Sequence, residues 1–176
     1  MSSATVSPYV VSMSELVRRF ATGAARRCIL DGLLRYRGEL RTLGFIEGFQ
    51  WLDGSFVEDV ESRESRAPND IDVVTFARPP LHTTTRVQVQ QLLDARPALF
   101  DRDSCKQGFH CDTTLVNLST SPEWLVKQTR YWYGLYSHRR GDAVWKGMLE
   151  APLVSDDALA RDLLDAMSVE RDSDAA

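Results

Sequence analysis

Two aspartates, Asp70 and Asp72, alternate with apolar residues in the segment Asp-Ile-Asp-Val-Val. Alternate side chains of a strand share a face, so both carboxylates should point the same way, while Ile71 and Val73 point into the core. Neighbouring carboxylates repel each other unless cations or hydrogen bonds compensate, and hard divalent cations such as Mg²⁺ bind such oxygens. An alternative without chemistry is that Asp70 caps a turn and Asp72 faces water at the edge of a strand.

Gly54-Ser55 and Asp112 lie in two other segments that suit the same chemistry. A glycine at the end of a strand lets the backbone approach a ligand, and the following N–H groups with the Ser55 hydroxyl can hold a phosphate. The alternative for this segment is a simple turn. Asp112 interrupts an apolar, strand-like run, where a charge should face a site or solvent rather than the core. Each segment alone is a weak signal.

Together, the order of Gly-Ser, a connection, Asp-x-Asp and a later strand aspartate resembles the DNA polymerase β-like nucleotidyltransferase superfamily. The resemblance covers about residues 45–118, and the 14 residues between Ser55 and Asp70 are at the upper end of the usual spacing. Residues 51–59 and 68–74 are also similar to a poorly characterised group of small bacterial nucleotidyltransferase-like proteins. The fold implied by this resemblance is a mixed β-sheet flanked by helices, of the α/β (α+β) class.

The resemblance also implies a two-metal nucleotidyl transfer. Asp70 and Asp72 would bind two Mg²⁺ ions, with Mn²⁺ as an alternative, and Asp112 would complete the site of the ion that activates the attacking hydroxyl. Gly54 and Ser55 would hold the triphosphate of a nucleoside triphosphate. A nucleoside monophosphate would then be transferred to an acceptor and pyrophosphate would leave, with no covalent enzyme intermediate.

Several cationic and aromatic residues outside these segments have two interpretations each. Lys106 could reach the triphosphate, or it could be a solvated loop lysine. Lys127 and Arg130, near the aromatic residues of 131–136, could hold a base or a nucleic-acid strand, or they could accompany a core-facing aromatic stripe. The patch Ser137–Arg140 could bind phosphate or an acidic partner, or could follow from the preference of helix C-termini for cations.

Hydrophobic periodicity predicts the elements that must position these residues. Apolar residues at helical spacing and the capping residues Ser121 and Ser155 indicate helices, and β-branched runs between turn residues indicate strands. The predicted helices cover residues 13–20, 24–43, 84–93, 122–135 and a last stretch from 155, and the predicted strands cover 45–53, 70–76, 109–118 and 144–153. Residues 1–11 should form a loose arm and residues 58–69 a solvated connection.

Length and composition fit one globular domain of 176 residues, with a catalytic core at about 45–118 and a helical cover at about 119–170. With 43% hydrophobic and 26% charged residues, extended disorder is excluded. The net charge of −4 gives no support to a basic nucleic-acid binder. Three widely spaced cysteines, the lack of a secretory signal and the lack of an apolar run of about 20 residues predict reduced thiols, a cytoplasmic location and no membrane contact.

Two functions from different classes remain open at this point. The first is a Mg²⁺-dependent nucleotidyltransferase acting on an RNA end, a protein hydroxyl or a small molecule. Analogy with the superfamily adds a toxin–antitoxin or phage-defence setting with a cognate partner protein. The second is a non-catalytic nucleotide- or partner-binding module that keeps the fold, although the presence of all three carboxylates favours the enzyme. A glycosyltransferase metal site would leave Gly-Ser without a role in a chain that is short for such an enzyme.

Overall fold

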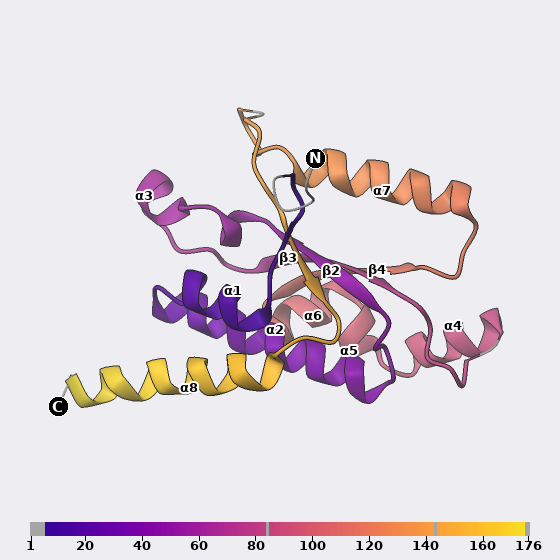
Figure 1. Ribbon diagram of the computed structural model, residues 1–176, viewed down its shortest axis with the longest axis horizontal. Coiled ribbons are helices and arrows are strands. Elements are labelled where there is room, and N and C mark those ends of the chain that lie inside the picture. Colours follow the sequence, from indigo (N-terminus) through magenta and orange to yellow (C-terminus); the bar gives the residue numbers. More distant parts are fainter. Residues whose placement is uncertain (1–5, 84, 143, 175–176) are drawn as a thin grey trace.

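A five-stranded mixed sheet forms the centre of the computed structural model, which describes residues 6–83, 85–142 and 144–174, with side chains as far as residue 168 (Figure 1). The strands are β1 (Tyr9–Val10), β2 (Gly48–Asp53), β3 (Ile71–Ala77), β4 (Cys111–Asn117) and β5 (Leu149–Pro152), in the order β1-β5-β2-β3-β4. β3 and β4 are parallel, as are β1 and β5, and β2 runs antiparallel to both of its neighbours. The predicted mixed sheet of the α/β class is confirmed.

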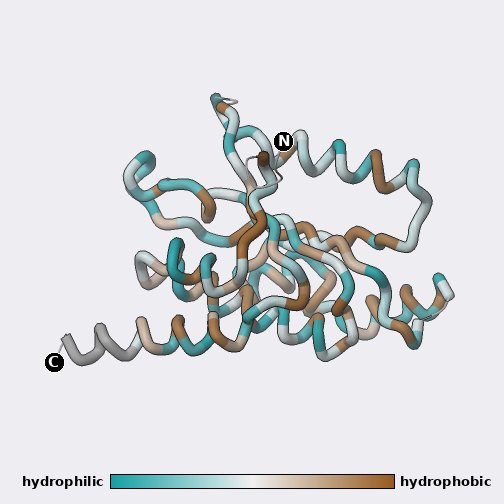
Figure 2. The backbone as a smooth tube through the Cα atoms, viewed as in Figure 1, coloured by the Kyte–Doolittle hydropathy of each residue, from teal (hydrophilic) through white to brown (hydrophobic). Residues whose placement is uncertain are grey.

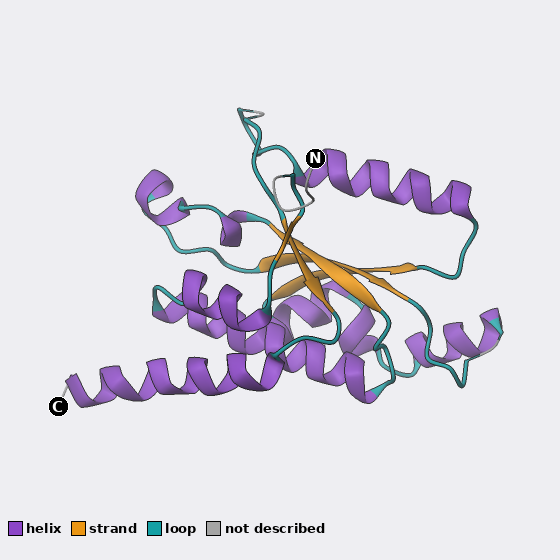
Figure 3. Cartoon of the chain, in the orientation of Figure 1, coloured by secondary structure: helices purple, strands orange, loops and turns teal. Residues whose placement is uncertain are grey.

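Helices cover both faces of this sheet (Figure 3). One face carries α1 (Met13–Phe20), α2 (Ala24–Thr42), α5 (Pro97–Phe100), α6 (Arg102–Phe109) and α8 (Asp157–Asp174), and the other carries α7 (Pro122–Tyr136). The short helices η2 (Ser55–Val57) and α3 (Val60–Glu64) follow β2 at one end of the sheet, and α4 (Arg86–Asp94) follows β3 at the opposite end. The α7 face therefore has the thinner helical layer.

Strand residues alternate between the two faces, as their sequence predicts. Ile71 and Val73 are fully buried in the larger core, which they share with the helices of the main face. Val74 instead joins Trp51 in a smaller, aromatic core beneath α7. Figure 2 shows the apolar residues following the strands and the helices packed on them. Asp72, between Ile71 and Val73, therefore points away from the main core and toward the α7 side.

A buried guanidinium joins the main helical face to the sheet. Arg37 of α2 is 2% exposed and donates to both carboxylate oxygens of Asp157 at the start of α8, at 3.0 Å and 2.9 Å. It also donates to the side chain of Gln50 in β2 at 2.6 Å and to the carbonyl of Pro152 in β5 at 2.7 Å. Gln50 donates in turn to Thr75 of β3 at 3.0 Å. No buried side-chain atom of this cluster is left without a partner.

Two predictions about local structure are wrong. Phe109 and His110 do not begin a strand but end α6, because His110 adopts a left-handed conformation (φ 54°) that stops the helix, and β4 begins at Cys111. The described part of the expected loose arm contains β1, which pairs with β5. The expected solvated connection is exposed at most of its residues, as predicted, but it also contains α3, whose Val60 is fully buried.

The other elements differ from the predictions mainly in length. The strand predicted over 144–153 is observed only at Leu149–Pro152, and α1, α2 and α7 lie where their periodicity and caps predict them. Thr84, the predicted start of a helix, lies outside the described residues, and α4 begins at Arg86. Neither α5 nor α6 follows from apolar periodicity. No helix in the described part of the chain combines the length and the apolarity that crossing a membrane requires.

Candidate active site

Three aspartates form a row across neighbouring strands at one end of the sheet. Asp53, the last residue of β2, pairs in register with Asp72 of β3, and Asp72 pairs in register with Asp112 of β4. Because adjacent residues such as Leu52 point into the main core, all three carboxylates face the α7 side. Asp70 immediately precedes β3. The structure thus brings Asp70, Asp72 and Asp112 together and adds Asp53 as a fourth carboxylate.

The turn after β2 approaches this row closely. Gly54 has a φ of 86°, and a Cβ atom there would lie 2.7 Å from Oδ2 of Asp72, so the turn requires glycine. Ser55 then begins the short helix η2. The turn is held from α2, where the buried Arg26 donates to the carbonyl of Phe56 at 2.6 Å. The two residues predicted to bind phosphate therefore lie directly beside the carboxylate row.

Two cations of α6 contact the aspartates on the β4 side. Lys106 Nζ lies 3.1 Å from Oδ2 of Asp70 and 2.9 Å from Oδ2 of Asp112, and Arg102 pairs with both oxygens of Asp112. Burial raises the pKa of Asp112, but the hydrogen bonds from Arg102 and Lys106 outweigh it and lower the pKa below its usual value. The interpretation of Lys106 as a solvated loop lysine is wrong, since Lys106 lies on a helix and pairs with two site carboxylates.

Asp53 and Asp72 are the least compensated charges of the row. Asp53 is 2% exposed, and its Oδ2 lies 3.0 Å from Nζ of Lys146, but its Oδ1 is buried with no hydrogen-bond partner among the described residues. Burial raises the pKa of Asp53 to about 7 against the opposing effect of Lys146. The Asp72 side chain makes no hydrogen bond or ion pair with any residue that the structure describes. Its pKa is raised by burial and then by repulsion from Asp112 and Asp70.

A hairpin that follows α7 forms the opposite wall of the site. Its arms, residues 137–142 and 144–146, are joined by an antiparallel bridge between His138 and Trp145, whose rings lie 4.5 Å apart. We name it the cationic hairpin, because four of its side chains line the site: His138, Arg139, Arg140 and Lys146. The basic patch that the sequence places at Ser137–Arg140 therefore lies at the site.

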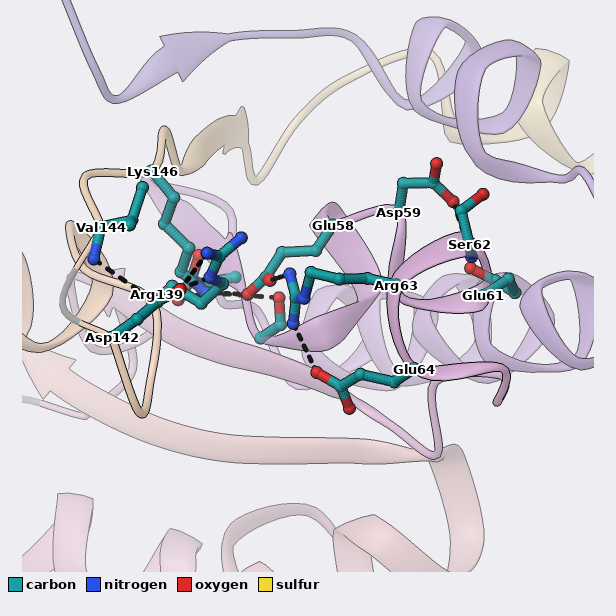
Figure 4. Close-up of polar contacts among 12 residues, drawn as sticks. Glu58, Asp59, Glu61, Ser62, Arg63, Glu64, Arg139, Asp142, Val144 and Lys146 are labelled. Atoms are coloured by element: carbon teal, nitrogen blue, oxygen red, sulfur yellow. Dashed lines mark hydrogen bonds and ion pairs between the residues drawn. The ribbon is translucent and has the colours of Figure 1, made fainter.

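Lys146 fastens the cationic hairpin to the end of β2. Its Nζ lies 3.0 Å from Asp53, 3.0 Å from Glu58 and 3.4 Å from the carbonyl oxygen of Gly54. Glu58 also pairs with Arg63 of α3, and Figure 4 shows these side chains pointing toward one another between the hairpin and the segment after η2. With three oxygens around it, the Lys146 ammonium has a fixed position.

The carboxylate row, the Gly54 turn, α6 and the cationic hairpin enclose a cleft of about 320 Å³. Tyr136, at the end of α7, lines this cleft and is 5% exposed. Burial, followed by repulsion from the three row aspartates, raises the pKa of Tyr136 well above its usual value, so its hydroxyl stays protonated. A larger cavity of about 760 Å³ lies at the other end of β3 and β4, beside Arg78 and Trp124, and contains none of the predicted site residues.

The site residues suit a divalent cation by their chemistry. All the donors are carboxylate oxygens, which Mg²⁺ and Mn²⁺ prefer, and the buried Oδ1 of Asp53 has no partner. In the part of the chain that the structure describes, no three His, Cys, Asp or Glu side chains already converge on a metal position. The contacts explain this, because Arg102 and Lys106 occupy carboxylate oxygens of Asp112 and Asp70.

The aromatic residues of α7 divide between the sheet and the solvent. Trp132 and Tyr133 pack on the smaller core with Tyr136, which favours the interpretation as a core-facing stripe. Tyr131 is 60% exposed. Lys127 and Arg130 are exposed and do not line the cleft.

Sequence reasoning missed four residues that build this site: Asp53, Arg102, Lys146 and Arg26. Asp53 has a local signal, since an acid at the end of an apolar strand directly before Gly-Ser has to face the same turn. Arg102 and Lys106 are four residues apart and share a helix face once Asp101 is recognised as an N-cap. Lys146 and Arg26 have no local signal, because tertiary packing alone brings them to the site.

Residues 4–152 match a protein family described as a family of unknown function, DUF6932. No curated protein matches the chain. A solved structure described as "Crystal structure of the toxin-antitoxin with AMP-PNP" is similar at 18% sequence identity, over 82% of this chain and 90% of that chain. Its TM-score of 0.24 is too low to support an inference about fold or function.

Proposed function

The chain belongs to the DUF6932 family of unknown function, and we propose that it is a nucleotidyltransferase, which transfers a nucleoside monophosphate from a nucleoside triphosphate to an acceptor. One observation carries this proposal. The Gly54-Ser55 turn packs against Asp72 where Asp72 and Asp112 stand in register on parallel strands. A phosphate-binding turn beside a row of carboxylates combines the two features that transfer of a phosphoryl group between two oxygens requires.

Divalent cations complete the proposed site. Asp70, Asp72 and Asp112 would hold two Mg²⁺ or Mn²⁺ ions, which when bound offset the charge of the triphosphate and activate the attacking hydroxyl. The residues fit this role because Asp72 has no partner among the described residues and carries a raised pKa, so a cation beside it removes an existing electrostatic cost. Arg102 and Lys106, released from Asp112 and Asp70, would then be free to bind phosphate or acceptor oxygens.

The chain's own groups position the triphosphate. The absence of a side chain at Gly54 lets the turn lie directly against the Asp72 carboxylate, and the N–H groups of the turn and the Ser55 hydroxyl would donate to phosphate oxygens beside it. Arg26 keeps this turn in place through the carbonyl oxygens of Phe56 and Glu58, at 2.6 Å and 2.7 Å. These donors are fixed before the nucleotide binds, so the free energy of binding is not reduced by the cost of ordering them.

On this proposal, the acceptor enters the site on the side of β4. This strand is the last in the sheet, with no further strand beside it, and the side chain of Arg102 above it is 64% exposed. The chemistry on this side suits any hydroxyl, and the three acceptor classes therefore stay open: an RNA end, a protein hydroxyl and a small molecule.

A label-transfer experiment tests the proposal. The protein is incubated with Mg²⁺ and nucleoside triphosphates labelled at the α-phosphate, together with total RNA or cell lysate. We expect labelled acceptor with the native chain and at least a roughly 10³-fold loss with Asp112→Asn. We expect no loss with Asp162→Asn, which removes an exposed carboxylate of α8 far along the chain from the site. Thermal unfolding monitors the fold of each variant.

Two results would reject the nucleotidyltransferase. In a parallel reaction with γ-labelled nucleotides, label transfer from the γ-phosphate and none from the α-phosphate would indicate a kinase. Mg²⁺-dependent nucleotide binding with no transfer in RNA, lysate or small-molecule mixtures would favour the non-catalytic binding module.

A further inference from the structure

The carboxylate row has two different sides. On the β4 side, the cations Arg102 and Lys106 are paired with Asp112 and Asp70. On the β2 side, the cationic hairpin brings Arg140 to the cleft, where Arg140 makes no hydrogen bond or ion pair with any described residue. The cations on the β4 side are therefore neutralised by aspartates, whereas Arg140 on the β2 side is unpaired.

The hairpin that carries Arg140 is anchored to the end of β2. It is closed by the His138–Trp145 bridge and fastened through Lys146 to Asp53 and Glu58, each at 3.0 Å. Arg140 is near enough to Asp72 for its charge to lower the pKa of that carboxyl. An exposed guanidinium held beside the carboxylate row is suited to an anion, because its fork binds two phosphate oxygens at once.

The order of the strands indicates which part of the nucleotide lies beside Arg140. β3 lies between β2 and β4, so Asp72 separates the Gly54 turn and the cationic hairpin from Asp112. In an in-line displacement, the attacking and leaving oxygens lie on opposite sides of the reacting phosphorus. If the acceptor hydroxyl enters beside Asp112, the bond to the bridging oxygen of pyrophosphate breaks on the β2 side.

We propose that Arg140, on the cationic hairpin, binds the β- and γ-phosphates of the nucleotide and receives the pyrophosphate that leaves. The inference rests on the proposed nucleotidyl transfer and adds the side of the site on which the leaving group lies. The bond from the α-phosphorus to the acceptor oxygen forms as the bond to pyrophosphate breaks, the proton of the acceptor hydroxyl passes to solvent, and the negative charge that collects on pyrophosphate develops beside Arg140. Asp53 and Lys146 are positioning residues, since they hold the hairpin and do not need to touch the nucleotide.

Inorganic tripolyphosphate with Mg²⁺ tests this assignment, because it carries the phosphates without a base, a sugar or an acceptor. Isothermal titration calorimetry measures its Kd for the native chain, Arg140→Ala, Arg140→Lys and two matched controls. Arg130→Ala removes an exposed arginine of α7, and Arg19→Ala removes an exposed arginine of α1; neither residue lines the cleft.

We expect Arg140→Ala to raise the Kd about tenfold or more, Arg140→Lys to restore part of the loss, and both controls to stay within about twofold of the native chain. The melting temperature should not change in Arg140→Ala, because Arg140 has no structural partner among the described residues. Native affinity in Arg140→Ala, or an equal loss in Arg130→Ala or Arg19→Ala, would overturn the assignment.

Failure of this assignment is distinguishable from failure of the proposed enzyme. Tripolyphosphate binding requires neither an acceptor nor transfer, so Arg140-dependent binding without any label transfer would keep the phosphate site and reject the nucleotidyltransferase. Label transfer with native tripolyphosphate affinity in Arg140→Ala would keep the enzyme and reject Arg140 as the residue that receives pyrophosphate.

Discussion

Two clusters of charged residues are built into the same sheet, and they satisfy their hydrogen bonds to different degrees. On the main helical face, Arg37 meets Asp157, Gln50 and a backbone carbonyl, and every buried polar side-chain atom there has a partner. At the end of the sheet, Asp53 keeps a buried oxygen without a partner, and the Asp72 side chain makes no hydrogen bond or ion pair with any described residue.

This difference separates a cluster that stabilises the fold from one that is prepared for a ligand. A buried ion pair repays its desolvation only when all its lone pairs and protons are used, and the Arg37 cluster meets this condition. The site cluster does not meet it, and its uncompensated carboxylates raise the free energy of the folded state, a cost that the proposed cations would remove. Stability is commonly given up at functional sites in this way.

We expect the largest loss of stability from a substitution in the Arg37 cluster. Arg37→Met leaves the Asp157 carboxylate buried with less compensation, so we expect the free energy of unfolding to fall by about 3–5 kcal/mol. Arg41→Met is the control, because Arg41 contacts the same carboxylate at 3.0 Å from a side chain that is 40% exposed, and should cost less than about 1 kcal/mol. Urea unfolding measures both variants, and equal costs would remove the distinction between the two clusters.

The raised pKa of Asp53 predicts that the stability of the fold depends on pH, an effect that we do not expect from the Arg37 cluster. Its pKa is about 7 in the folded chain against about 4 in an unfolded one. Between these values the folded state holds a proton that the unfolded state has released, so stability falls as pH rises from about 4 to about 7 and is constant above. The contribution is of the order of 2–4 kcal/mol.

Urea unfolding of the metal-free protein from pH 4 to 8 checks this prediction, with Asp53→Asn as the variant that should lose this part of the profile. Asp94→Asn, at an exposed carboxylate of α4, should keep it. An unchanged profile in Asp53→Asn would assign the pH dependence to other carboxylates and contradict the uncompensated state of Asp53.

The site residues that sequence reasoning found are those whose signal is local. Asp70 and Asp72 share a strand face, Gly54 and Ser55 end an apolar run, and Asp112 interrupts another apolar run. The sequence pattern and the family resemblance were therefore sufficient to select these residues. The pairing of Asp53 with Asp72 depends on strand register, which the sequence does not specify without the partner strand. Lys146 and Arg140 reach the site only because a hairpin after α7 folds back to β2, and this depends on tertiary packing.

Arg26 connects the two kinds of cluster, because it is buried like Arg37 but holds a turn of the site. Its guanidinium donates to the carbonyls of Phe56 and Glu58 and pairs with Glu61 at 2.6 Å. If the proposed function holds, Arg26→Met should raise KM for the nucleoside triphosphate about tenfold with little change in kcat, since the turn loses its fixed position. Arg27→Met is the control, because the Arg27 side chain makes no hydrogen bond or ion pair with the described residues. A fall in kcat at unchanged KM would contradict a positioning role.

The smallest effect should have the opposite sign. Asp72→Asn removes a partly buried charge whose pKa is raised by burial and by two neighbouring carboxylates, so the metal-free chain should gain up to about 1 kcal/mol of stability at pH 7. Added Mg²⁺ should stabilise the native chain and not the variant, because ligand binding to the folded state shifts unfolding by mass action. Thermal unfolding with and without Mg²⁺ measures both. A loss of stability in Asp72→Asn without metal would place Asp72 with the Arg37 cluster, as a group that supports the fold rather than one that awaits a cation.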